Sequence, residues 1–182
     1  MFIPIRRQKT KRMIVIVCGL PGSGKSYFAS LLAKRIKASY INSDRLRKKL
    51  FVNSLHTEKE KIEVYVEMLR QLKEALKENK NIVLDATFYK ATIRKKFLDE
   101  IGGKDMSFII EVKAGQRVIR KRLSKPRAYS EADFKIYKKI EKQWEPIFEK
   151  HLVLDSTDNN IDAMMLDALH YLRTCHDSRA GQ

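Results

Sequence analysis

Short apolar runs alternate with longer amphipathic segments along this chain of 182 residues. The runs lie at residues 13–17, 39–42, 82–85, 106–112 and 151–155, and most of them are rich in Val, Ile and Leu. Continuous runs of this kind predict strands that are buried on both faces, as in parallel sheets. Because helical segments separate the runs, the pattern predicts an α/β fold with a five-stranded parallel sheet and helices on both faces.

The helices predicted between these strands have recognisable starts. Thr57 and Glu60 form a capping box ahead of an amphipathic helix that continues to about residue 78. Ser130 is expected to cap a later helix, with Asp133 in its first turn. The other helices are expected at 27–36, 45–51, 91–101, 116–123 and 161–173.

A glycine-rich stretch follows the first predicted strand. Residues 19–26 fit the pattern G-x-x-x-x-G-K-[ST] at every fixed position, and a predicted helix follows them, as the P-loop motif requires. Backbone N–H groups of such a loop bind phosphates, its lysine neutralises the outer phosphates, and its hydroxyl binds Mg²⁺. We therefore expect a nucleoside triphosphate and Mg²⁺ as cofactors in a P-loop NTPase fold of the nucleoside-kinase kind. The residues expected to bind the nucleotide are Gly22, Ser23, Gly24, Lys25, Ser26 and Tyr27.

Two carboxylates follow predicted strands at the edge of the sheet where this loop should lie. Asp44 comes after the strand at 39–42, and Asp85 ends the strand at 82–85. Ligands of parallel sheets bind outside the carboxyl ends of the strands, so both are expected near Lys25, which is a catalytic candidate. Asp44 is expected to take a proton from an acceptor hydroxyl, although it could instead only cap a helix. Asp85 is expected to hold Mg²⁺ together with Ser26, or to contact the acceptor.

Three further residues are candidates for the acceptor side. Arg47 lies one helical turn after Asp44 and is expected to bind an acceptor phosphate through its guanidinium. Thr87 follows Asp85 and is expected to line the acceptor site. Phe88 could either stack on a base or pack in the core.

The net charge of +16 predicts attraction to phosphate-rich partners. The positive excess lies at residues 6–12, 45–49 and 113–127, whereas the segment 58–80 is balanced in charge. The last basic run contains no acid and is expected to belong to a lid near 117–130. In such a lid Arg122 or Arg127 would act on the transferred phosphoryl group. The run could also be a surface that faces nucleic acid.

Three regions are predicted from the remaining composition: a basic extension at 1–12, a single domain at 13–175 and a flexible tail at 176–182. No apolar run approaches the length of about 20 residues that a membrane span needs. Cys18 and Cys175 have neither disulfide nor zinc spacing, and Cys18 is expected to be a small buried filler. We expect a cytoplasmic protein, because the apolar and basic parts of the N-terminus come in the reverse order of a secretory signal.

Four stretches together resemble a known group of enzymes. They are 19–26, 44–47, 83–87 and 122–127. They are similar to the P-loop kinase domain of the polynucleotide 5′-hydroxyl kinases and to the small AAA-type kinases that include the zeta-toxin sugar-nucleotide kinases. The resemblance covers roughly residues 13 to 155, although Pro126 departs from the lid spacing.

The resemblance implies a role for each matching residue. ATP would be the phosphoryl donor and Asp44 the general base. Arg47 would bind the 3′-phosphate of the acceptor, and Asp85 would lie near the acceptor or the metal ion. Arg122 or Arg127 would act from the lid.

The leading hypothesis is therefore an ATP-dependent kinase whose acceptor is the 5′-hydroxyl of a nucleotide or polynucleotide. One alternative is a kinase for a small metabolite, a sugar nucleotide or an antibiotic. It would share Lys25 and Asp44 but would not need a charge of +16. Another alternative is a nucleotide-regulated nucleic-acid-binding module, which would have no need of a general base.

Overall fold

The computed structural model describes residues 12–55, 57–103, 106–125 and 132–180, with only the backbone described from residue 175 onward. The predictions for Arg127 and Ser130, and those for most of the segment 1–12, lie outside these residues. No helix in the described part of the chain is long and apolar enough to cross a membrane.

All five predicted strands are present and form one parallel sheet in the order β2-β3-β1-β4-β5. Pairing places Val17 of β1 beside Asp85 of β3, and Asp85 beside Asn42 of β2. The polar ends of β2 and β3 therefore meet at the carboxyl edge of the sheet. The strands are β1 (Met13–Cys18), β2 (Ser39–Asn42), β3 (Ile82–Asp85), β4 (Met106–Lys113) and β5 (Leu152–Asp155).

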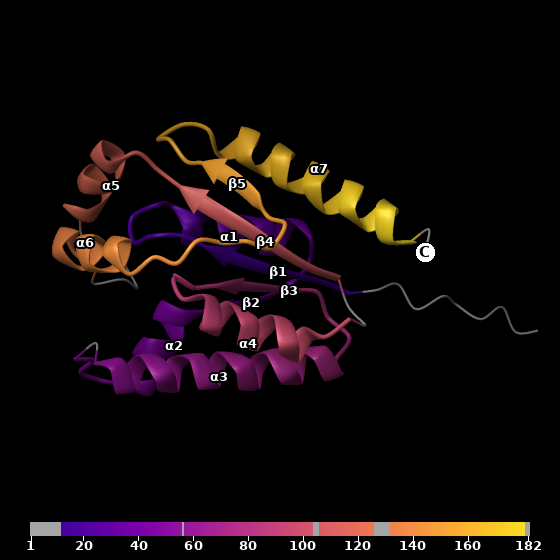
Figure 1. Ribbon diagram of the computed structural model, residues 1–182, viewed down its shortest axis with the longest axis horizontal. Helices are drawn as coiled ribbons and strands as arrows, with labels where there is room; N and C mark the ends of the chain where they lie inside the picture. The colour runs from indigo at the N-terminus through magenta and orange to yellow at the C-terminus, as the bar shows by residue number, and fades with distance from the viewer. Residues whose placement is uncertain (1–11, 56, 104–105, 126–131, 181–182) are drawn as a thin grey trace, which may run out of the picture.

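Helices cover both faces of the sheet, which confirms the predicted fold class (Figure 1). The helices α2, α3 and α4 lie on one face, and α1 and α7 lie on the other. The short helices α5 and α6 lie at the end of the molecule toward which the β4 arrow points. The helices are α1 (Lys25–Arg35), α2 (Ser43–Leu50), α3 (Glu58–Lys77), α4 (Ala91–Ile101), α5 (Gln116–Leu123), α6 (Phe134–Lys142) and α7 (Ile161–Ala180).

Alternate residues of the strands supply two separate apolar cores. Ile14 and Ile16 of β1 pack into the core formed with α3 and α4. Val15 and Val17 pack into the core formed with α1 and α7. All four are fully buried, which explains why the strand has no polar alternation.

Several helix boundaries differ from the prediction. The N-cap of α2 is Asn42, whose side chain accepts a hydrogen bond from the Arg45 amide at 2.8 Å, so Asp44 lies in the first turn instead of capping. Asp133 is itself the N-cap of α6, where it accepts from the Ile136 amide. The backbone of α7 remains helical to Ala180, beyond the predicted end. Short polar side chains compete for cap positions, so the sequence pattern did not resolve which one caps.

Two aromatic residues that lie outside the strands and helices, Phe88 and Trp144, belong to the core. Phe88 is fully buried and contacts Phe97 edge-to-face with ring centroids 5.1 Å apart. Of its two proposed roles, core packing is the correct one. Trp144 comes after the end of α6 at Lys142 and packs against the core on the α3 side of the sheet.

Candidate active site

The glycine-rich loop between β1 and α1 has backbone conformations that other residues rarely adopt. Gly19, Gly22 and Gly24 have φ angles of 150°, 79° and 94°. A Cβ atom added at Gly19 would lie 2.3 Å from the carbonyl oxygen of Val112, and one added at Gly24 would lie 2.8 Å from Oγ of Ser156. Conformation and space both require glycine, so the loop lies closely against β4 and the connection after β5.

The loop leads directly into the N-terminus of α1. Gly24 is the N-cap and offers no side-chain acceptor to the first amides of the helix. Such an N-terminus attracts anions through its free N–H groups and its dipole. Lys25 and Ser26 add an ammonium and a hydroxyl group in the first turn. This arrangement can bind the phosphates of a nucleoside triphosphate.

Asp85 lies at the end of β3 and is completely buried. Its Oδ2 atom accepts hydrogen bonds from Tyr40 Oη at 2.6 Å and from Asn42 Nδ2 at 2.5 Å. Its Oδ1 atom is buried and accepts no hydrogen bond from the described residues. Burial raises the pKa of this carboxyl, whereas the charge of Lys25 and hydrogen bonds, including one from Ser26, act to lower it.

These features fit a Mg²⁺ site that is completed by phosphate oxygens. Mg²⁺ prefers hard oxygen ligands and commonly takes few of them from the protein. Ser26 supplies a hydroxyl, and the unused Oδ1 of Asp85 supplies a carboxylate oxygen that can reach the ion directly or through water. Among the described residues no group of three or more His, Cys, Asp or Glu side chains could hold a metal ion. A site of this kind therefore depends on the nucleotide for its other ligands.

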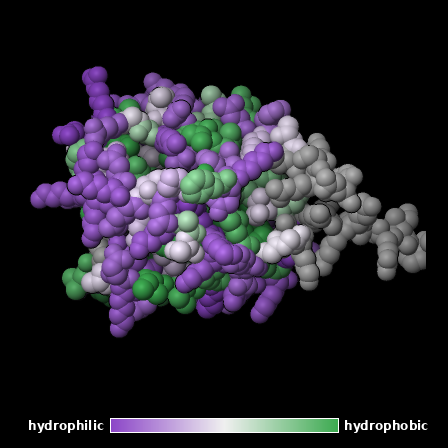
Figure 2. Space-filling model, viewed as in Figure 1, coloured by the Kyte–Doolittle hydropathy of each residue, from purple (hydrophilic) through white to green (hydrophobic). Residues whose placement is uncertain are grey.

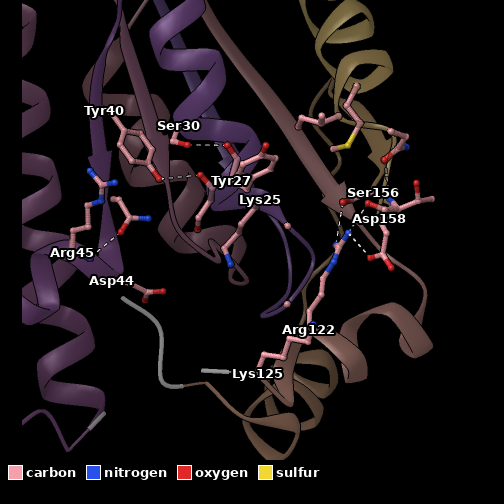
Figure 3. Close-up of a pocket in the computed structure, with 18 residues that line it drawn as sticks. Lys25, Tyr27, Ser30, Tyr40, Asp44, Arg45, Arg122, Lys125, Ser156 and Asp158 are labelled. Carbon is pink, nitrogen blue, oxygen red and sulfur yellow. Dashed lines mark hydrogen bonds and ion pairs between the residues drawn. The ribbon is translucent and has the colours of Figure 1, made fainter. Parts of the chain in front are cut away.

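A cavity of about 720 Å³ opens beside the phosphate loop (Figure 3). Lys25 lines the cavity from the loop and Asp44 lines it from α2. Asn42 is already the cap of α2, so the carboxylate of Asp44 is not needed for capping. The predicted base and the predicted phosphate ligand therefore share one cavity. The cavity is also lined by Gly22, Gly24, Ser26, Tyr27, Tyr40, Arg122, Lys125, Asn160, Ile161 and Met164.

Arg47 does not line this cavity but lies next to it, between α2 and α3. Its Nη1 atom is 3.8 Å from Oε2 of Glu60, and both side chains are 13% exposed. The same Nη1 is buried and makes no hydrogen bond to any described residue. Tyr65 lies close by, and its hydroxyl is 3.4 Å from the hydroxyl of Thr87. The predicted acceptor residues Arg47 and Thr87 thus both lie near Tyr65.

Arg122 is held by three hydrogen bonds. Its Nη1 donates to the Ser23 carbonyl and to Ser156 Oγ, both at 3.1 Å. Its Nη2 donates to the Thr157 carbonyl at 2.6 Å. The guanidinium therefore ties the phosphate loop to the connection between β5 and α7 (Figure 3). This position is beside the phosphate loop, and the bonds connect α5 to that loop.

The predicted basic run lies mostly on the exposed side of α5. Arg117, Arg120 and Lys121 are exposed, and the guanidinium carbon of Arg120 lies 4.2 Å from the ring centroid of Phe134 on α6. Lys121 forms an ion pair with Asp158 at 2.6 Å. Figure 2 shows hydrophilic side chains over this end of the molecule. Part of the charge excess is therefore displayed on the exposed side of α5.

Three residues that the sequence analysis did not single out help to form the site. Tyr40 and Asn42 hold Asp85 through their hydrogen bonds. Arg94 of α4 is fully buried and donates to the carbonyls of Phe88 and Pro146 at 2.9 and 2.6 Å. It thereby fixes the loop that follows Asp85. Asn42 could have been found from the sequence, because it is a polar residue at the end of a predicted strand. Nothing in the local pattern distinguished Arg94 from a surface arginine.

Solved kinases share this fold. A gluconokinase from Sinorhizobium meliloti 1021 aligns with a TM-score of 0.70 and 16% identity, over 97% of this chain and 99% of that chain. The APS kinase CysC of Mycobacterium tuberculosis, in complex with AMPPNP and APS, aligns with a TM-score of 0.65 and 18% identity, over 90% and 98% of the two chains. A chain of the Pnkp1/Rnl/Hen1 complex aligns with a TM-score of 0.56 and 20% identity, over 72% of this chain and 46% of that chain.

Sequence comparison identifies the family. A search of curated proteins found no match. The AAA_33 family, described as an AAA domain, matches residues 14–147 and thus includes the phosphate loop, Asp44 and Asp85. The chain belongs to the AAA_33 family.

Proposed function

We propose that this protein is an ATP-dependent kinase that transfers the γ-phosphoryl group to a hydroxyl acceptor. The observation that carries the proposal is that Lys25 and Ser26 of the phosphate loop share one cavity with Asp44. A phosphate loop alone would serve any nucleotide-binding protein. A carboxylate that faces the loop, and that does not cap its helix, is what transfer to a hydroxyl requires.

The proposed reaction is an in-line displacement at the γ-phosphorus. Asp44 accepts the proton of the acceptor hydroxyl while its oxygen bonds to phosphorus. The bond from phosphorus to the bridging oxygen of the β-phosphate breaks, and ADP is released. Lys25 and the loop amides stabilise charge on the phosphate oxygens. Ser26 and Asp85 would hold Mg²⁺, which neutralises charge on the β- and γ-phosphates when bound.

The acceptor that we favour is the 5′-hydroxyl of a nucleotide or polynucleotide. Arg47 supports this choice, because its buried Nη1 lacks a hydrogen-bond partner among the described residues and lies one turn after Asp44. A guanidinium in such a place suits a phosphate on the acceptor. The exposed basic residues of α5 would favour a polyanionic substrate in the same way.

A kinase for a small metabolite is the second candidate. The ion pair of Arg47 with Glu60 supports it, because the pair as a whole is neutral and could bind hydroxyl groups instead of a phosphate. The gluconokinase aligns over nearly the full length of both chains, so the fold itself is compatible with a small acceptor.

The test is to supply γ-labelled ATP with 5′-hydroxyl oligonucleotides, nucleoside 3′-phosphates and a panel of sugars and other metabolites. We expect label on the nucleotide acceptors and none in the Lys25→Ala variant, which should lose at least about 10²-fold in turnover. Label on a metabolite alone would establish the second candidate. Labelled inorganic phosphate without any labelled acceptor would instead indicate a nucleotide-hydrolysing binding module.

A further inference from the structure

Two stripes of basic side chains lie on the outer sides of α5 and α6. Within each helix the basic residues are three or four positions apart, so each set follows one face of its helix. All of them are exposed except Lys138, which is half-buried. We call these residues the α5–α6 basic surface: Arg117, Arg120 and Lys121 on α5, and Lys135, Lys138, Lys139 and Lys142 on α6.

The ring of Phe134 brings the two stripes together. The guanidinium carbon of Arg120 lies 4.2 Å from the ring centroid, and Nζ of Lys138 lies 5.9 Å from the same centroid. Tyr137 is buried and stacks on Phe134 with the centroids 5.2 Å apart, which fixes the ring on α6. One aromatic side chain therefore contacts cations from both helices, and the two stripes lie side by side at this point (Figure 1).

Few acids neutralise this surface. Lys121 pairs with Asp158 at 2.6 Å, and Lys138 pairs with Glu141 at 2.7 Å. Asp133 is engaged as the N-cap of α6. The remaining basic residues form no ion pair with any acid that the structure describes: Arg117, Arg120, Lys135, Lys139 and Lys142.

The helix α3 shows that this chain can neutralise exposed charge. Arg70 pairs with Glu67 and with Glu74, and Lys61 pairs with Glu58. Like charges that are not neutralised repel one another and oppose folding. Their concentration on the α5–α6 basic surface therefore points to an anionic partner.

The apolar content of the surface decides between kinds of anionic partner. Helices that bind a membrane surface, and interfaces between proteins, use exposed apolar side chains at their centre. The large apolar side chains that are exposed in the described part of the chain all lie outside α5 and α6. The phosphates of a nucleic acid need only positive charge and hydrogen-bond donors. The α5–α6 basic surface therefore fits a nucleic-acid backbone better than a membrane or an acidic protein.

Arg120 shows how this surface can contact a phosphate. Its guanidinium lies over the ring of Phe134, and its side chain donates no hydrogen bond to any residue that the structure describes. A cation–π contact restrains an arginine without using its N–H donors. The guanidinium is therefore held in place while its donors remain available to phosphate oxygens.

We propose that the α5–α6 basic surface binds the sugar-phosphate backbone of a nucleic-acid strand. The proposal goes beyond phosphoryl transfer, because this binding requires neither ATP nor the residues that line the cavity. Contacts to the backbone carry no sequence information, so the affinity is independent of base sequence and falls as the salt concentration rises.

The test compares two variants that lose the same charge from different ends of the molecule. Three exposed cations of the surface are neutralised in the first variant: Arg117→Gln, Lys135→Gln and Lys142→Gln. Three exposed cations in the last turns of α1 and α3 are neutralised in the second: Lys34→Gln, Arg35→Gln and Lys77→Gln. These two helices lead into the starts of β2 and β3, at the edge of the sheet opposite the phosphate loop.

Fluorescence anisotropy of a labelled single-stranded oligonucleotide, without ATP and at several salt concentrations, measures the binding. In the first variant Kd should rise at least about tenfold at about 0.1 M salt. The log-log slope of affinity against salt should become shallower by about 2, because each contact with a single strand contributes about 0.7. The second variant should bind about as tightly as the wild type. An equal loss in both variants would show that net charge alone attracts the strand, and would overturn the proposal.

Vesicles that contain phosphatidylserine distinguish a membrane from a nucleic acid. Binding of the wild type to such vesicles but not to the oligonucleotide would assign the surface to a membrane and overturn the proposal.

The same measurements separate this proposal from the proposed function. Selective loss of oligonucleotide binding in the first variant, in a protein that phosphorylates only metabolites, would refute the polynucleotide acceptor and leave the surface standing. Phosphorylation of an oligonucleotide that the wild type and the first variant bind equally well would refute the role of the surface and leave the kinase standing.

Discussion

The donor half and the acceptor half of the proposed site are built in different ways. In the donor half, three glycines set the backbone, and Asp85 is fully buried among fixed hydrogen bonds. In the acceptor half, Asp44, Arg47 and Glu60 are side chains of two packed helices, α2 and α3. A site formed by strained backbone tolerates few substitutions. A site formed by helix side chains can change its substrate specificity through a single substitution. We infer that the specificity of this chain lies in the acceptor half.

The largest expected effect is a loss of turnover that leaves ATP binding in the donor half intact. Asp44→Asn should lower kcat by about 10²–10⁴-fold, because it removes the general base, while the affinity for ATP stays close to that of the wild type. Asn42 caps α2, so the stability should hardly change. Turnover with saturating acceptor and ATP affinity from calorimetry provide the two readings. Normal turnover in this variant would leave the acceptor half without its central residue.

Asp85→Asn tests whether burial in the donor half serves function at the expense of stability. We expect kcat to fall by about 10²-fold through loss of a metal ligand. Because burial raises the pKa of Asp85, the folded state binds this proton more tightly than the unfolded chain does. The stability from that proton is present at low pH and is lost as pH rises through the folded-state pKa.

The variant should therefore be more stable than the wild type at neutral pH, with a difference that shrinks toward acid pH. Urea unfolding of both proteins across this range measures it. A variant that is less stable at neutral pH would mean that the ionised carboxylate stabilises the fold, against the direction of its pKa shift.

The smallest of these effects concerns Arg122, which lies at the border of the donor half. Its three hydrogen bonds to Ser23, Ser156 and Thr157 hold the phosphate loop, so Arg122→Gln should raise KM for ATP about tenfold. The turnover number should change less. A fall in kcat of about 10³-fold with unchanged KM would assign Arg122 to the transferred phosphoryl group instead.

The same contrast explains what the sequence could predict. The phosphate loop is local, because strand, glycines and helix follow one another, and it was located in full. The strand order was not predicted, so the partners of Asp85 were missed: Asn42 lies beside it only because β2 pairs with β3. The pairing of Arg47 with Glu60 depends likewise on how α2 packs on α3. The basic run at residues 113–127 could be read from the sequence. Which of its side chains are exposed on α5 could be seen only in the structure.

The contact between α5 and the phosphate loop has a consequence for communication within the molecule. A Cβ atom at Gly22 would lie 2.9 Å from Cγ of Leu123 and 3.1 Å from Cγ2 of Ile119, so α5 rests on the loop where a side chain is missing. The outer side of the same helix carries Arg117 and Arg120. A ligand that binds more tightly when α5 is shifted would therefore change the affinity of the loop for nucleotide. Bound nucleotide would change the affinity for that ligand by the same factor. Because Gly22 has no side chain, Ile119 and Leu123 pack directly over the loop, so a displacement of α5 would also disturb the loop.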